Sequence, residues 1–323
     1  MSNLSHPDST RAILFPGQGS QFVGMARDLF ENETVARDMF EIASERMGRD
    51  LMALCAEGPQ EVLNATDVCQ PAIFVASLAA VKVIENSGGA SHLEARATAG
   101  LSLGEYSALV HSGAIRFEDA LDVVIARGKA MQEACDKTAG TMASILGLDL
   151  ETVREAVSEE ASEAGIVAVA NVNAATQIVI SGEKAAVELA SEKAREKGAR
   201  RVIPLEVAGA YHSPLMASAT ETLKPILANL QIAEPEIPFY ANVSGARVSD
   251  PEEIREGLIR QVESSVLWEP TLRLLIEDGV AEVLEPGPGK VVAGLVRQVD
   301  RSIPTRSVLA KDSIEELLEG TPS

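Results

Sequence analysis

The amino-acid sequence predicts an α/β fold in which a smaller unit is inserted into a larger domain. Two observations lead to this fold class. Apolar segments of strand length alternate with helical patterns along most of the 323 residues. Between residues 140 and 207 the order changes to strand, helix, strand, strand, helix, strand. We therefore expect a large α/β subdomain formed by residues 1–139 and 208–323, and a small one formed by residues 140–207.

The first part of the chain contains one predicted strand followed by helices. Residues 12–15 (AILF) are apolar, of strand length, and run directly into the glycine-rich segment PGQGSQ. Apolar residues then recur at helical spacing in several segments. Helices are expected over residues 22–30, 35–47, 71–86 and 117–135.

The middle of the chain contains the predicted inserted unit. Strands are expected over residues 141–148, 166–173, 177–182 and 199–207, and helices over residues 150–165 and 183–198. This order of elements is that of a ferredoxin-like unit.

After residue 207 the alternation of helices and strands resumes. Strands are expected over residues 235–245 and 280–286, and helices over residues 213–230, 252–262, 268–277 and 290–299. The residues after 318 are expected to be frayed.

Composition and charge exclude several classes of protein. Hydrophobic residues make up 46% of the chain but aromatic residues only 3%, so aliphatic side chains and alanine must form most of the core. The formal net charge of −20 argues against non-specific nucleic-acid binding. We find no apolar run of bilayer-spanning length and no signal-like start in MSNLSHPDST, so we expect no contact with a membrane.

The three cysteines, Cys55, Cys69 and Cys135, are scattered and form no CxxC pair. Such an odd, sparse set is typical of reduced thiols, and it predicts a cytoplasmic protein. The histidines are isolated and no acidic cluster has ligand spacing, so we expect no metal site. A monomer is the expected oligomeric state.

The segment AGLSLGEYSALV, residues 99–110, places Ser102 between Gly100 and Gly104. A serine on a tight strand-to-helix turn, flanked by glycines that let backbone segments approach closely, has the geometry of an activated nucleophile. The helix N-terminus would supply amide hydrogens to a developing oxyanion. Alternatively, Ser102 caps the helix, and Glu105 three residues later completes a capping box. The motif alone does not decide between these interpretations.

A serine nucleophile needs a base, and the four histidines narrow the choice. His6 lies near the N-terminus and His92 lies in a polar loop. His111 is about 13 Å from Ser102 along a helix that rises ~1.5 Å per residue, which is too far for a base. His212 follows small residues at the end of a predicted strand and is the best remaining candidate, although it could also be a loop histidine at a helix start.

The predicted helix over residues 117–135 carries an arginine on its apolar side. Val124, Met131 and Ala134 form the apolar stripe, and Arg127 lies on the same stripe. A buried guanidinium needs an anionic partner. That partner could be an internal carboxylate in a structural ion pair, or the carboxylate of a substrate held by two hydrogen bonds.

Five motifs along the chain together identify a protein family more specifically than any one of them alone. They are FPGQGSQ at 15–21, GLSLGEYSALV at 100–110, ARGKAMQ at 126–132, GAYHSPLM at 209–216 and EPGPGKVVAGL at 285–295. In order and spacing, over nearly the whole chain, they resemble the malonyl-CoA:acyl carrier protein transacylase family. This resemblance favours the nucleophile interpretation of Ser102.

The resemblance implies a role for each matching residue. Ser102 would be the acylated nucleophile, His212 its base, and the backbone carbonyl of Gln261 would orient the histidine. Arg127 would bind the malonyl carboxylate. The implied fold is an α/β-hydrolase-like core with an inserted ferredoxin-like (β-α-β-β-α-β) subdomain.

The backbone amides of Gln18 and Leu103 would form the oxyanion hole. The implied activity is transfer of a malonyl group from malonyl-CoA to the phosphopantetheine thiol of acyl carrier protein, through a malonyl-serine intermediate with ping-pong kinetics, to supply fatty acid synthesis. No cofactor is implied. The alternatives are a discrete acyltransferase for polyketide synthesis, a serine thioesterase on the same core, and a non-catalytic carrier-docking protein.

The sequence departs from the family pattern at three places. Leu101 stands where the family usually has histidine, and Tyr211 stands where malonyl-selective members have phenylalanine. The segment after Gln261 lacks the usual proline and arginine, which makes the orientation of its loop a question for the structure.

A basic cluster precedes His212 and could bind the acidic carrier protein, although such a run is more often a solvated helix face. Its members are Lys193, Arg195, Lys197, Arg200 and Arg201.

Overall fold

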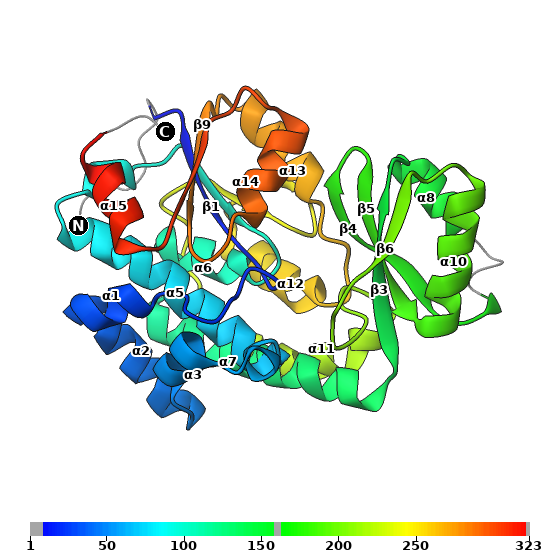
Figure 1. Ribbon diagram of the computed structural model, residues 1–323, viewed down its shortest axis with the longest axis horizontal. Coiled ribbons are helices and arrows are strands. Elements are labelled where there is room, and N and C mark those ends of the chain that lie inside the picture. Colours follow the sequence, from blue (N-terminus) through cyan, green and yellow to red (C-terminus); the bar gives the residue numbers. More distant parts are fainter. Residues whose placement is uncertain (1–8, 158–162, 321–323) are drawn as a thin grey trace.

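The computed structural model describes residues 9–157 and 163–320. His6 and residues 321–323, for which the sequence analysis gave expectations, lie outside this part of the chain. Within it, the strands form one six-stranded and one four-stranded sheet. Figure 1 shows the four-stranded sheet and its helices beside the larger sheet and its helices, so the fold is mixed α/β.

The larger sheet has the strand order β10-β9-β1-β2-β7-β8. Its neighbouring strands are parallel, except for the antiparallel pair β7 and β8. The strands are β1 (Arg11–Phe15), β2 (Ala97–Gly100), β7 (Phe239–Ala241), β8 (Ala246–Val248), β9 (Glu282–Pro286) and β10 (Thr305–Val308). Phe15 pairs with Gly100, so the loops that follow β1 and β2 leave the same edge of the sheet, where ligands bind in open α/β sheets.

Both faces of the larger sheet are covered by helices, which explains why β1 is apolar at successive positions. Ile13 and Phe15 pack into the core on one face, while Ala12 and Leu14 pack into a second core on the other. Figure 1 shows α1, α2, α3, α5 and α7 on one side of β1 and β9, and α13 and α14 on the other. Their bounds are α1 (Arg27–Asn32), α2 (Thr34–Met47), α3 (Leu51–Glu57), α5 (Thr66–Asn86), α7 (Phe117–Lys137), α13 (Trp268–Glu277) and α14 (Val291–Val299).

Helix α5 is the central helix of this core, and it corrects one expectation. It begins at Thr66, five residues before the predicted start at Pro71, which lies inside the helix. Among the described residues it is the one helix long and apolar enough to cross a membrane, with a mean hydropathy of 1.6. The expectation that no apolar run reaches that length is therefore wrong. The apolar stretch is 89% buried inside the protein, as in the core helix of a globular domain.

The smaller sheet is antiparallel and has the order β4-β5-β3-β6. It is built from β3 (Gly140–Leu146), α8 (Leu150–Ala156), β4 (Val167–Ala174), β5 (Gln177–Glu183), α10 (Lys184–Glu196) and β6 (Arg201–Pro204), in the predicted sequence of elements. One face packs on α8 and α10. On the other face Met142, Ala170 and Val179 join the main core, so the smaller sheet is anchored to the larger unit.

The remaining elements are short or connect these layers. They are α4 (Gln60–Leu63), α6 (Gly104–His111), α11 (Ala217–Asn229), α12 (Pro251–Gln261), α15 (Lys311–Leu318) and the 3₁₀ turns Ala90–His92 and Pro214–Met216. Helices α3, α4 and α15 and strands β8 and β10 were not expected, since each has at most eight residues. The helix expected over 22–30 begins only at Arg27, because Gly24 and Ala26 adopt positive φ and form a turn.

A buried histidine predicts how stability responds to acid. His111 packs against the Phe15 ring, and its Nε2 has no hydrogen-bond partner in the described chain. Burial lowers its pKa from 6.5 to about 4, so between these pH values the unfolded state binds more protons and the folded state loses stability as the pH falls. When the pH falls from 7 to 4.5, we expect the free energy of unfolding to decrease by about 2 kcal/mol less in His111→Leu than in the parent. Urea unfolding at the two pH values measures this, and equal losses in both proteins would contradict it.

Candidate active site

Ser102 lies on a tight turn between β2 and α6 that only glycines on both sides allow. Its φ of 52° is in the left-handed region. A Cβ at Gly100 would lie 1.9 Å from the carbonyl carbon of Gly104, and a Cβ at Gly104 would lie 2.4 Å from the Phe15 oxygen. The glycines therefore let α6 begin directly against the ends of β1 and β2.

The helix-cap interpretation of Ser102 is wrong. Leu103 occupies the N-cap position of α6, and no side chain caps this helix. Glu105 does not close a capping box; its carboxylate is buried and accepts hydrogen bonds from Asn242 and Gln261.

The structure brings Ser102 and His212 together from positions 110 residues apart. Ser102 Oγ lies 2.9 Å from His212 Nε2. His212 Nδ1 lies 2.9 Å from the backbone oxygen of Gln261 and 3.1 Å from that of Ser264. Because carbonyl oxygens only accept, Nδ1 carries the proton and the lone pair of Nε2 faces the serine hydroxyl. The backbone N–H of His212 also donates to Val262, which fixes the histidine loop at the end of α12.

The electrostatic surroundings keep His212 neutral. Burial, followed by the positive charge of Arg127, lowers its pKa from 6.5 to about 4, and the two carbonyl contacts offset this only in part. At neutral pH the imidazole is therefore unprotonated and able to take a proton from Ser102.

Arg127 lies inside this site, on the buried face of α7 as its place in the apolar stripe predicted. Its side chain is 1% exposed. Nη2 donates to Ser102 Oγ at 3.1 Å and to Gln261 Oε1 at 2.8 Å, and Nη1 donates to Gln70 Oε1 at 2.7 Å. In the described chain no carboxylate forms an ion pair with it, and its Nε has no acceptor. The guanidinium is thus held by neutral oxygens, and burial lowers its pKa.

Two residues of the site were missed in the sequence. Gln70 of α5 holds Arg127, and Asn242, directly after β7, accepts from Ser102 N at 2.7 Å and donates to the Gly100 oxygen at 2.7 Å. Gln70 could have been noticed as a polar residue within an apolar helix. Asn242 carries no such signal, because its role depends on the pairing of β2 with β7.

The loop after β1 lies directly against the Ser102 turn. A Cβ at Gly17 would lie 2.2 Å from the Leu101 oxygen. This contact places Gln18 and Leu103 on adjoining segments. Within residues 9–157 and 163–320, the backbone N–H groups of Gln18 and Leu103 have no hydrogen-bond acceptor.

Two of the three departures from the family pattern, Leu101 and Tyr211, are accommodated in the buried interior. Leu101 joins the second apolar core. Tyr211 is buried, its hydroxyl lies 2.6 Å from Thr66 Oγ1, and it accepts a hydrogen bond from Gln18 Nε2 at 3.3 Å. Burial raises the pKa of Tyr211, so the hydroxyl is un-ionised.

A family model described as the acyl transferase domain matches residues 13–311. The chain belongs to the acyl transferase family. This acyl transferase is 43% identical over 304 residues to the malonyl CoA-acyl carrier protein transacylase of Bacillus subtilis, with 94% of this chain and 95% of the relative covered.

Solved structures agree with this assignment. An acyl carrier protein S-malonyltransferase from Vibrio cholerae is 40% identical, has a TM-score of 0.90, and covers 96% of this chain and 100% of its own. A malonyl-transacylase solved with a type II PKS acyl-carrier protein is 39% identical, has a TM-score of 0.91, and covers 97% of this chain and 100% of its own.

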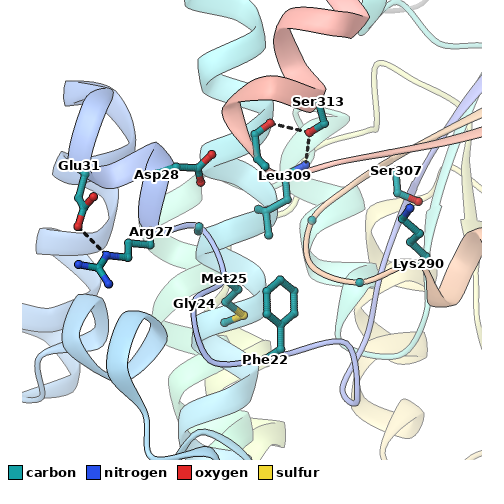
Figure 2. Close-up of a pocket in the computed structure, with 14 residues that line it drawn as sticks. Phe22, Gly24, Met25, Arg27, Asp28, Glu31, Lys290, Ser307, Leu309 and Ser313 are labelled. Carbon is teal, nitrogen blue, oxygen red and sulfur yellow. Dashed lines mark hydrogen bonds and ion pairs between the residues drawn. The ribbon is translucent and has the colours of Figure 1, made fainter. Parts of the chain in front are cut away.

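A separate cavity of this acyl transferase is lined by residues of the segment after β1, of the loop after β9 and of the segment 307–313. Its volume is about 580 Å³, and Figure 2 shows Phe22, Met25 and Leu309 around it, with Lys290 at one side and the Arg27–Glu31 pair at the other. Ser102, His212 and Arg127 do not line it. It is therefore distinct from the site of the serine and histidine.

The effect of the Arg127 charge can be measured through the pKa of His212. We expect Arg127→Ala to raise the pKa of His212 from about 4 toward its ordinary 6.5, because the cation disfavours the imidazolium. Gln70→Leu removes an Arg127 contact but keeps the charge, so the pKa should stay low. NMR titration of the His212 ring measures both, and an unchanged pKa in Arg127→Ala would contradict the assignment.

Proposed function

We propose that this acyl transferase moves a malonyl group from malonyl-CoA to the phosphopantetheine thiol of acyl carrier protein, and so supplies fatty acid synthesis. One observation carries the proposal. A buried guanidinium that has no carboxylate partner among the described residues lies 3.1 Å from the hydroxyl of the candidate nucleophile. An acyl group on Ser102 that bears its own carboxylate would supply the missing anion. The names of the relatives support the same reaction.

The proposed reaction has two matched halves. His212 Nε2 takes the proton of Ser102 as Oγ attacks the thioester carbon of malonyl-CoA. When the carbon–sulfur bond breaks, the imidazolium returns the proton to the departing CoA sulfur and malonyl-serine remains. The carrier thiol then gives its proton to His212 and attacks the ester carbon. Ser102 leaves with that proton, which restores the free enzyme without a cofactor.

The tetrahedral intermediate of each half needs donors for its oxyanion. We assign this role to the backbone N–H groups of Gln18 and Leu103. Two observations support the assignment: neither amide has an acceptor among the described residues, and the loops that carry them are in contact.

The architecture supports a finer fold assignment. The strand order β6-β3-β5-β4, with α8 and α10 on one face, is that expected of a ferredoxin-like subdomain over residues 140–207. The parallel sheet and the serine turn after β2 favour an α/β-hydrolase-like core over residues 1–139 and 208–323. The buried, free thiols of Cys55, Cys69 and Cys135 fit a reducing cytoplasm. The monomer stays a prediction.

A polyketide-serving transferase would use the same chemistry, whereas a thioesterase would not need Arg127. The first test is therefore intact-protein mass spectrometry after mixing with malonyl-CoA or acetyl-CoA. We expect a persistent malonyl adduct on Ser102, absent in Ser102→Ala. Rapid release of free malonate instead would identify a hydrolase.

The second test concerns selectivity. Arg127→Ala should lower malonyl transfer by at least about 100-fold while acetyl transfer persists, since the carboxylate loses its partner. Equal losses for both acyl groups would make Arg127 a structural residue only.

We further propose a carrier docking surface around an arginine-lined cavity of about 780 Å³ between the smaller sheet and α14. Arg200, Arg297 and Arg301 line it, and none of the three has an ion-pair partner in the described chain. Arg200 is a member of the predicted basic cluster, whereas two other members, Lys193 and Lys197, pair with Glu196 and Glu155. The cavity therefore offers an acidic protein unpaired positive charge on a chain of net charge −20.

Charge reversal tests this surface. Arg200→Glu combined with Arg297→Glu should raise the KM for carrier protein about tenfold and leave malonyl-CoA acylation unchanged. Lys197→Glu, on the same side but already paired, is the matched control and should change neither. An unchanged KM for carrier protein in the double variant would exclude the cavity as the docking surface.

A further inference from the structure

Glu105 is a buried carboxylate that the reaction itself does not use. It lies in the first turn of α6, three residues after Ser102, and is 2% exposed. It forms no ion pair in the described chain. A buried carboxylate without a cationic contact is costly, so its hydrogen bonds must account for its place in the fold.

Both carboxylate oxygens accept hydrogen bonds from donors. Oε1 accepts from the backbone N–H of Asn242 at 2.8 Å, and Oε2 accepts a hydrogen bond from Gln261 Nε2. Burial raises the pKa of Glu105 to about 7, whereas these two donors and the charge of Arg127 lower it. The Asn242 N–H and the Gln261 NH₂ are both donors and could not accept a hydrogen bond from a protonated carboxyl. Their arrangement therefore suits the ionised form of Glu105.

The carboxylate decides how the Gln261 amide is oriented. The NH₂ group of Gln261 donates to Glu105 and to the Ser102 backbone oxygen at 2.9 Å. Its Oε1 is then directed at Arg127 Nη2, 2.8 Å away. A flipped amide would set NH₂ against the guanidinium and oxygen against carboxylate, and would lose all three contacts.

The same carboxylate supports the serine turn. Through its backbone N–H, Asn242 is fixed by Glu105, and its side chain bonds Ser102 N and the Gly100 oxygen. Gln261 and Asn242 therefore both donate to the Glu105 carboxylate. Gln261 also contacts Arg127, and Asn242 also contacts the backbone of Ser102.

We propose that Glu105 is a positioning residue that sets the preference for carboxylate-bearing acyl groups, by holding the Gln261 amide so that its oxygen aligns Arg127. This rests on the proposed role of Arg127 in binding the acyl carboxylate. The Gln261 amide separates the carboxylate from the guanidinium, so Arg127 is aligned without a direct ion pair.

The test is Glu105→Gln, which keeps the size of the side chain but replaces one acceptor by an NH₂ group. That group must face either the Asn242 N–H or the Gln261 NH₂, so one contact becomes donor against donor. We expect the ratio of malonyl to acetyl kcat/KM to fall at least about tenfold, mainly through the KM for malonyl-CoA. A ratio equal to that of the parent would overturn the proposal.

A matched control separates positioning from stability. Glu285 is also a buried carboxylate, and it accepts from Val292 N and Ala293 N at the start of α14 and from the Ser307 hydroxyl of β10. Glu285→Gln should lower the unfolding midpoint as Glu105→Gln does but keep the malonyl preference. If both variants lose the preference alike, Glu105 has a structural role only.

If Glu105→Gln does not fold, Gln261→Met tests the same chain of contacts from Glu105 through Gln261 to Arg127. This substitution removes the side-chain amide and keeps the backbone oxygen that faces His212. Retained malonyl preference in this variant would overturn the proposal. Failure of the underlying function is seen separately: the parent would then form no malonyl adduct on Ser102, or Arg127→Ala would not change the preference.

Discussion

The site is organised around a buried positive charge with which no carboxylate of the described chain forms an ion pair. Arg127 is held by the amide oxygens of Gln70 and Gln261 and by the hydroxyl of Ser102. Neutral oxygens satisfy hydrogen bonds but offset little of the desolvation cost of a guanidinium. That unfavourable state is relieved when an anion enters, which links binding of an acidic acyl group to the stability of the site.

The same charge acts on the chemistry. By disfavouring the imidazolium it adds to burial in keeping His212 neutral, so the base is ready before substrate arrives. An incoming carboxylate would reduce the net charge beside the histidine, which favours the proton transfer from Ser102. Gln261 joins both effects, because its backbone oxygen orients His212 and its side chain orients Arg127.

Much of this arrangement could be predicted from the sequence. The spacing of Gly100, Ser102 and Gly104 predicts a crowded turn, and Arg127 is conspicuous on an apolar stripe. The roles of Asn242 and Glu105 could not be predicted, because they depend on the pairing of β2 with β7 and on the packing of α12 beside α6. Helix α5 was predicted to begin at Pro71, whereas the turn before Pro71 already forms part of the helix.

The most direct measurement is a crystal structure of the enzyme acylated by malonyl-CoA. We predict a malonyl ester on Ser102 whose free carboxylate lies within hydrogen-bond distance of the Arg127 guanidinium, with the Gln261 amide still facing Glu105. An ester whose carboxylate points to solvent, while Arg127 keeps only its contacts to Gln70 and Gln261, would contradict the account.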